Sequence, residues 1–506
     1  MTGADGTNVL FVVLDTVRKD HLSAYGYDEP TTPTLEAFAE EAAVFEHAVA
    51  PAPWTLPVHA SLFTGLYPSE HEATQEDPYL DGATTLAESL SAAGYDTACY
   101  SSNAWITPYT NLTAGFDDHD NFFQIMPSEL LSGPLARIWQ TMNDSDTLRG
   151  VADRMVQLGN TLHEYFASEG GGDTKTPAVI DETMDFIDDS ENFFTFINLM
   201  DAHLPYHPPE EYVEQFAPGV DSAEVCQNSK EFNCGARDID DAEWDDIEGL
   251  YDAEIRHIDD QLDRLFTHLK ETGQWDETMV VVAADHGELH GEHALYGHEF
   301  CIYDPLVNVP CMVKHPEIEP ERDDETVVEL VDLYHSVLDA TGVAGDGVSL
   351  DPTRSLLSTE YREFAGTTSN GAGAHGPRGD VGFVEYHQPV VELRQLEGKA
   401  SAAGIALETD SRFYSRMGAA RSPEGKYIHC TRIPDEAYRI DSDPGETEDR
   451  AGSDDELLAD LEAELSDFVD RVDADWPDEA DGTDGEVLDS MDDDAKDRLK
   501  DLGYID

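Results

Sequence analysis

The sequence predicts an α/β protein whose central sheet is mainly parallel. Continuous apolar runs of strand length occur at residues 8–14, 193–199 and 278–284, as expected for strands covered on both faces. Segments with helical apolar spacing lie between these runs, so strands and helices alternate along the chain. In open sheets of this kind, ligands bind beyond the carboxyl ends of the strands.

The elements of the first part of the chain follow from local signals. After the strand at residues 8–14, a proline near its start and apolar residues at helical spacing predict a helix over residues 33–44. A second helix is predicted over residues 57–63, closed by Gly65. A third is predicted over residues 85–93, followed by a strand over residues 98–101.

Further along, residues 193–199 and 278–284 are predicted to be buried strands. Between them, apolar residues recur at helical spacing from Ile247 to Leu269 and predict a long amphipathic helix that ends near Gly273. Residues 327–340 are predicted to be helical.

Composition along the chain suggests where its parts divide. Residues 1–345 are interpreted as one catalytic domain, in which residues 118–185 form a helical insertion near the active-site face because they lack strand signals. Residues 346–450, which include a glycine-rich stretch, are interpreted as a smaller C-terminal subdomain that completes the fold. Residues 451–506 are very acidic but keep helical periodicity, so we expect a docked helical segment.

The net charge of −79 and the isoelectric point near 4.1 are extreme. Because the acidic residues lie in segments with regular apolar periodicity, we interpret them as the solvated surface of a halophilic protein. An acidic surface repels anions in dilute buffer, whereas at 1 M salt the Debye length is only about 3 Å. We therefore expect activity that rises with salt, and no nucleic-acid partner.

The sequence shows neither a secretory signal nor an apolar stretch long enough to span a bilayer, which predicts a cytoplasmic protein. In that compartment most of the six cysteines are expected to be free thiols. A disulfide between Cys226 and Cys234 is the less favoured alternative.

Chemically active residues occur at three places in the chain that the predicted fold would bring close together. Asp15 directly follows the first strand, Asp285 and His286 directly follow another, and Thr55 leads into a helix. Each signal is weak alone, since an aspartate at a strand end is often a cap or turn residue. Together, hard oxygen ligands and one imidazole predict a site for one divalent ion: Mg²⁺, Mn²⁺ or Ca²⁺, with Zn²⁺ as a further possibility.

Several motifs resemble those of one family. Thr55-Leu-Pro-Val-His59-Ala-Ser61-Leu-Phe-Thr64-Gly65 has the spacing Cys-x-Pro-x-Arg-x-Ser-Leu-x-Thr-Gly of a sulfatase nucleophile loop. Four further segments match in the right order: residues 8–22, 198–206, 284–298 and 438–446. The chain thus resembles the sulfatase family of the alkaline-phosphatase superfamily, as a haloarchaeal-type member, and this implies an α/β/α sandwich.

The resemblance also implies roles for individual residues. Asp15, Asp285 and His286 would bind one divalent metal, with the Thr55 oxygen in the same coordination sphere. His203 would hold or protonate the ester. His298 stands where many members have an anion-binding lysine, and Asn103 would be a further anion contact.

Three departures from the family pattern concern the chemistry. Family members oxidise a cysteine or serine to formylglycine, whereas Thr55 carries a methyl group and cannot become that aldehyde. Its hydroxyl can still attack beside a divalent cation, which lowers the pKa of an oxygen that it binds. His59 replaces an arginine and is a cation only when protonated. Thr16 replaces a second metal carboxylate.

These features predict a metal-dependent hydrolase that cleaves sulfate or phosphate esters. The substrate is predicted to be a small-molecule ester or a glycan ester. One alternative is a transferase that passes a phosphoryl-type group to an alcohol. Another is a catalytically inactive binding protein with the same fold.

Each histidine also has a simpler interpretation: His203 packs under its loop, His298 is a surface residue, and His59 is a passive helical neighbour. The oligomeric state does not follow from the sequence.

Overall fold

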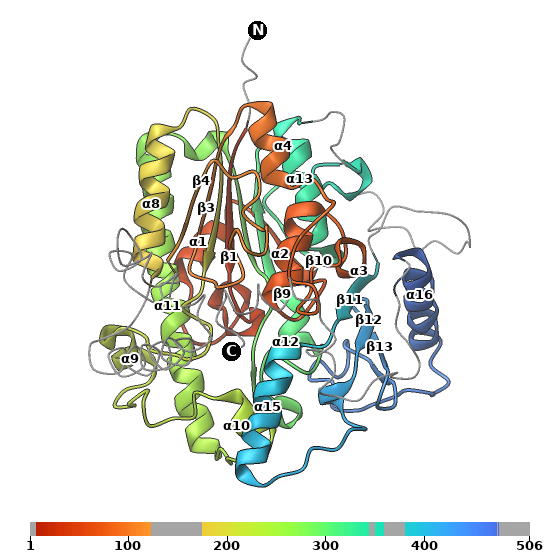
Figure 1. The fold of residues 1–506 in the computed structure, drawn as a ribbon. Coiled ribbons are helices and arrows are strands. Elements are labelled where there is room, and N and C mark those ends of the chain that lie inside the picture. Colours follow the sequence, from red (N-terminus) through yellow and green to blue (C-terminus); the bar gives the residue numbers. More distant parts are fainter. Residues whose placement is uncertain (1–6, 123–174, 344–349, 359–379, 473, 475–506) are drawn as a thin grey trace, which may run out of the picture.

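The computed structural model describes residues 7–122, 175–343, 350–358, 380–472 and 474 (Figure 1). Its centre is an eight-stranded sheet in the order β10-β2-β9-β6-β1-β5-β3-β4. All neighbouring pairs are parallel except those of β9, which runs antiparallel to β2 and β6. This confirms the predicted mainly parallel sheet. The strands are β1 (Asn8–Leu14), β2 (Ala43–Val49), β3 (Asp96–Ser101), β4 (Asp118–Asn121), β5 (Phe193–Leu199), β6 (Thr278–Ala284), β9 (Asn308–Lys314) and β10 (Arg322–Glu329).

Helices cover both faces of this sheet (Figure 1). One layer contains α1 (Pro33–Ala39), α8 (Thr176–Asp189) and α11 (Asp241–Thr272), and the other contains α2 (Thr55–Thr64), α4 (Leu86–Ala93) and α13 (Val331–Thr341). The remaining α-helices of the described residues are α3 (Pro68–His71), α9 (Glu210–Phe216), α10 (Ser229–Asn233), α12 (Asp304–Val307), α15 (Val390–Ala403) and α16 (Glu456–Val472). None of the helices in the described part of the chain is both long and apolar enough to cross a membrane.

The three central strands end at the same level. In β1, Leu14 pairs with Leu199 of β5 and with Ala284 of β6, and every residue of the three strands is buried. Their continuous apolar runs form strands here because helices cover both faces of the sheet. The aligned register places Asp15 and Asp285 next to each other, one residue beyond the strand ends.

A smaller antiparallel sheet follows near the C-terminal end, with strands β11 (Gly382–Tyr386), β12 (Met417–Arg421), β13 (Lys426–Cys430) and β14 (Glu436–Tyr438). It joins the segment before Thr55, because Glu385 N donates to Pro51 O at 2.8 Å. The domain boundaries at residues 345 and 450 stay a prediction.

The C-terminal motif at residues 438–446 braces the loop after β6. Glu446 is buried and accepts a hydrogen bond from Asp304 N at 2.6 Å, at the start of α12. In the same helix, Leu306 O accepts from Gly287 N at 2.8 Å. The motif therefore supports the backbone of Gly287, next to His286. That loop also contains the two-stranded sheet of β7 (Leu289–His290) and β8 (Tyr296–Gly297).

Two predicted helices were too long. The helix predicted over residues 33–44 ends at Ala39, and residues 43–49 form β2 between β9 and β10. The helix predicted over residues 327–340 begins at Val331, because residues 322–329 form β10. Both errors lie at strands whose pairing partners are distant in sequence, so tertiary hydrogen bonding overrides the local pattern.

The predicted insertion at residues 118–185 is only partly described. Residues 118–121 form the edge strand β4, contrary to the expected lack of strands, and α8 is helical as expected. Residues 123–174 lie outside the described residues, as do the glycine-rich stretch and residues 475–506. In the acidic C-terminal segment, α16 packs against β12 and β13.

All six cysteines are buried free thiols. The alternative pairing of Cys226 with Cys234 is not formed. Cys226 Sγ instead donates to Asn228 O and Cys234 Sγ to Glu231 O, each at 3.6 Å.

His71 is a buried histidine that must be neutral to keep its hydrogen bonds. Its Nδ1 accepts from Ala73 N at 3.0 Å, while its Nε2 lies 3.1 Å from Ser61 Oγ and 3.2 Å from Pro57 O in α2. Burial, together with the nearby His387, lowers the pKa of His71 to about 3. Below about pH 6.5 the unfolded chain therefore binds a proton that the folded chain does not.

We predict that acid destabilises the native protein more than it destabilises His71→Gln. As the pH falls from about 6.5 towards 4, the unfolding free energy of the native protein should drop, relative to the variant, by up to about 1.4 kcal/mol per pH unit. Guanidinium unfolding of both proteins at several pH values measures this difference. A difference that does not change with pH would contradict the neutral state of His71.

Candidate active site

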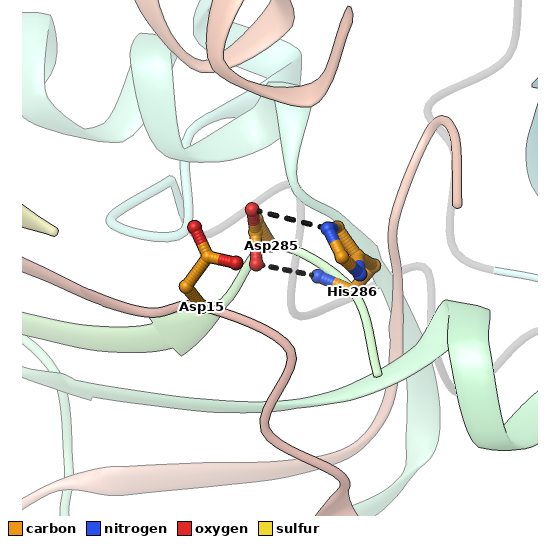
Figure 2. A group of neighbouring side chains, drawn as sticks. All are labelled: Asp15, Asp285 and His286. Atoms are coloured by element: carbon orange, nitrogen blue, oxygen red, sulfur yellow. Dashed lines mark hydrogen bonds and ion pairs between the residues drawn. The ribbon is translucent and has the colours of Figure 1, made fainter. Parts of the chain in front are cut away.

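Asp15, Asp285 and His286 form a buried cluster at the carboxyl ends of β1 and β6 (Figure 2). One ligand atom from each residue lies within 4.8 Å of the others, and all three side chains are fully buried. The two strands are adjacent and parallel, so their ends present side chains to the same space. The structure thus brings together the three residues that the sequence predicted as metal ligands.

The unpaired oxygen atoms in this cluster fit a divalent cation. Asp15 Oδ1 and Asp285 Oδ2 are buried and accept no hydrogen bond from the described residues, although His286 Nε2 lies 3.5 Å from Asp285 Oδ2. Burial raises the pKa of Asp285 well above its usual value, and the neighbouring Asp15 carboxylate raises it further. Two carboxylates forced together in a dry interior are costly unless a positive charge lies between them. Two carboxylates and one imidazole are a suitable donor set for such an ion.

A set of amides and hydroxyls orients Asp15. Asn198 Nδ2 donates to Asp15 Oδ2 at 3.1 Å, and Asn198 Oδ1 accepts from Ser101 Oγ at 3.0 Å. Although burial opposes ionisation, the electrostatic influence of the nearby His203 and His286 and the hydrogen bond from Asn198 hold the pKa of Asp15 below its usual value. The roles of Asn198 and Ser101 were missed from the sequence. Their only signal was a polar residue near the end of an apolar strand.

Thr16, which stands at the position of a second metal carboxylate, directs its hydroxyl to the backbone. Its Oγ1 lies 2.6 Å from Ala202 O and 2.7 Å from Asp15 O, so the hydroxyl bonds to backbone carbonyls. Its φ of 59° is rare for a β-branched residue. In this conformation, Thr16 N donates to Asp285 Oδ1 at 3.3 Å.

Thr55 is the first residue of α2, two residues earlier than the predicted helix start. Its Oγ1 lies 3.4 Å from His286 Nε2 and accepts from Asn103 Nδ2 at 3.3 Å. The side chain is 4 % exposed. The hydroxyl therefore lies directly beside the carboxylate cluster and at the positive end of a helix.

Asn103 links the threonine to the cluster. Its Nδ2 also donates to Asp15 Oδ2 at 2.8 Å, while its Oδ1 accepts from Trp105 N at 2.9 Å. These contacts fix the orientation of the amide. Asn103 thus lies in the site as predicted, but its amide nitrogen already contacts Asp15 and Thr55.

His59 is held neutral. Its Nδ1 lies 2.9 Å from Thr55 O and 3.7 Å from Asp285 Oδ2, and its Nε2 lies 3.4 Å from Asn198 Nδ2. Burial lowers the pKa of His59 to about 4, although Asp15 partly opposes this. Near neutral pH, His59 therefore does not supply the charge of the arginine for which it stands.

His203 and His298 lie on another side of His286. The ring centroids of His298 and His286 are 4.5 Å apart, and those of His298 and His203 are 5.2 Å apart. His298 Nδ1 lies 3.2 Å from Glu288 Oε1. Burial opposes protonation of His298, but Glu288 raises its pKa to about 9. His298 is therefore a cation at neutral pH, and Glu288 is a further residue missed from the sequence.

Comparisons with known proteins identify a family and similar structures. The model of the family described as Sulfatase matches residues 7–343. An arylsulfatase of Clostridium perfringens is 23% identical to this chain, over 71% of this chain and 80% of that protein. The phosphonate monoester hydrolase of Agrobacterium radiobacter is similar in structure, with a TM-score of 0.63 and 19% identity over 92% of this chain and 95% of that one. Another similar structure was solved in complex with its substrate D-glucosamine-2-N,6-O-disulfate, with a TM-score of 0.65 and 16% identity over 94% and 100% of the two chains.

Proposed function

The chain belongs to the sulfatase family, and from this premise we propose that it cleaves sulfate or phosphate esters through the hydroxyl of Thr55. Like its relatives it is an ester hydrolase. In the proposal, Asp15, Asp285 and His286 hold one divalent cation. The substrate is a small-molecule or glycan ester. One similar structure holds a sulfated sugar, which supports the glycan alternative.

The observation that carries this proposal is the position of the Thr55 hydroxyl. The hydroxyl lies 3.4 Å from His286 Nε2 and 3.3 Å from Asn103 Nδ2, next to the cluster whose two carboxylates each have one oxygen without a hydrogen bond from the described residues. A divalent cation bound by these carboxylates would lower the pKa of a neighbouring hydroxyl and make it a better nucleophile. Asn103 orients the threonine oxygen for attack, since its own amide is fixed by Asp15 and the backbone.

His298 and His203 are the proposed contacts of the substrate's oxygen atoms. The protonated ring of His298 is the proposed contact of the negatively charged oxygen atoms of the ester. His203, beside it, is the proposed proton donor to the leaving alcohol. The covalent ester on Thr55 is then broken by water, because a threonine has no second hydroxyl that could expel the group. This route is more natural for a phosphorus ester than for a sulfate monoester.

A substrate panel tests the reaction class. We propose assaying nitrophenyl sulfate, nitrophenyl phosphate, a nitrophenyl phosphodiester and a phosphonate monoester side by side, with Mg²⁺, Mn²⁺, Ca²⁺ or Zn²⁺. Because we also propose that the charge of −79 is an adaptation to high salt, the panel is run in dilute buffer and in molar salt. No turnover of any ester in any condition would contradict the proposal.

His298 offers a more specific prediction. His298→Ala should lower kcat/KM for the best ester by about 10²- to 10³-fold, the usual cost of losing one donor to a developing negative charge. His298→Lys should retain more activity than His298→Ala, because a cation remains. Steady-state kinetics of the two variants measure this. Equal activity in both would remove His298 from the anion site.

A further inference from the structure

A buried tyrosine clamps the turn that follows Asp15. Tyr251, in the middle of α11, is fully buried. Its hydroxyl accepts a hydrogen bond from Arg18 N at 2.7 Å and donates one to Thr16 O at 2.7 Å. One phenol oxygen thus ties together the backbone on either side of Val17, although it comes from a helix more than 230 residues away in sequence.

The turn needs such support because its backbone is strained. Thr16 has a φ of 59°, and a β-branched residue in this region costs on the order of 1 kcal/mol or more. In this conformation Thr16 N donates to Asp285 Oδ1 at 3.3 Å. That contact and the one from His286 N at 2.9 Å both end on Oδ1, and Asp285 Oδ2 accepts no hydrogen bond within the described part of the chain.

The tyrosine ring is itself held in place. Its centroid lies 4.7 Å from that of His290, 5.2 Å from that of His21 and 5.4 Å from that of Tyr206. The arginine at the other side of the turn is fixed too, because Arg18 Nη1 donates to Glu292 Oε1 at 2.6 Å, in the loop after β6. The Tyr251 hydroxyl therefore joins α11 to a turn that is also bonded to the loop after β6.

We infer that Tyr251 is a positioning residue for the cation site: its hydroxyl holds the strained Thr16 turn and thereby aligns the carboxylates of Asp15 and Asp285. This inference rests on the metal site of the proposed function. Tyr251 touches neither the cation ligands nor the substrate groups, so its effect is on metal affinity. Partners that orient metal ligands from outside typically change metal affinity by about 10- to 100-fold when removed.

Tyr25 provides a matched control. Its hydroxyl donates to Cys311 O at 2.9 Å and accepts from Cys311 N at 2.8 Å, which is the same pair of backbone contacts. These contacts are to β9, which contributes no residue to the cluster. Tyr25→Phe and Tyr251→Phe each remove one hydroxyl with two backbone partners, so a merely structural effect should be similar in both.

The experiment measures Mn²⁺ binding by isothermal titration calorimetry, using the full chain after removal of bound metal by a chelator. We expect the Kd of Tyr251→Phe to rise by about 10- to 100-fold while that of Tyr25→Phe stays close to the native value. In addition, saturating Mn²⁺ should restore the kcat of Tyr251→Phe. A shift in Kd no larger than that of Tyr25→Phe would overturn the inference.

Asp285→Asn separates failure of the inference from failure of the metal site. If Asp285→Asn binds Mn²⁺ as tightly as the native protein does, both the proposed metal site and the proposed role of Tyr251 are refuted. If Asp285→Asn loses Mn²⁺ binding while Tyr251→Phe keeps it, the site stands and only the clamp is refuted. Circular dichroism of each variant confirms that the comparison is made between folded proteins.

Discussion

Thr55→Ala should lower kcat for the best nitrophenyl ester by roughly 10⁴- to 10⁶-fold, as expected when a covalent nucleophile is removed. The physical reason is that alanine leaves no oxygen beside the carboxylate cluster to attack the ester. The structure should survive, because in the ranges that the structure describes the Thr55 hydroxyl makes two long contacts, with Asn103 at 3.3 Å and His286 at 3.4 Å. Steady-state and single-turnover assays with the preferred metal measure the loss.

Two further variants make the result specific. Thr55→Ser keeps a hydroxyl and should keep measurable turnover. Thr64→Ala, in the same helix, removes a buried hydroxyl that donates to Ala60 O and should keep near-native turnover. Mass spectrometry of the native protein, quenched during turnover, should find the transferred group on Thr55. Unchanged kcat in Thr55→Ala would refute the nucleophile assignment.

Asp285→Asn should abolish the stabilisation of the folded protein by metal. A ligand that binds only the folded state adds about 2.7 kcal/mol of stability at a concentration of 100 times its Kd. The native protein should therefore unfold at a higher temperature when Mn²⁺ is added. Asp285→Asn loses an anionic metal ligand. The loss of Mn²⁺ affinity should exceed the 10- to 100-fold that is typical when a residue that only orients a metal ligand is removed. Thermal unfolding with and without Mn²⁺ measures both.

A buried aspartate elsewhere serves as the control for this experiment. Asp259 is 1 % exposed and accepts hydrogen bonds from Thr34 N and Leu35 N at the start of α1. Asp259→Asn should be less stable than the native protein but should gain the same stability from Mn²⁺. A metal-dependent gain that persists in Asp285→Asn would place the cation elsewhere.

Local sequence was sufficient for the elements at the centre of the fold. The runs of β1, β5 and β6 are apolar throughout because helices cover both faces of the sheet, and α11 keeps its apolar spacing up to its glycine cap. It was insufficient for β2 and β10, which were assigned in part to helices. β2 pairs with β10 and with β9, and such long-range pairing leaves little trace in a local window.

The sequence by itself determined the sulfatase-like motifs, and hence that Asp15, Asp285, His286 and Thr55 meet near the carboxyl ends of the central strands. It could do so because the register of parallel strands aligns residues that follow strand ends. Only the tertiary structure decided that His59 is neutral, that the Thr16 hydroxyl bonds to backbone carbonyls, and that the Tyr251 hydroxyl bonds to the backbone of Thr16 and Arg18. Burial and hydrogen bonds from distant segments set these states, and no local pattern of residues encodes them.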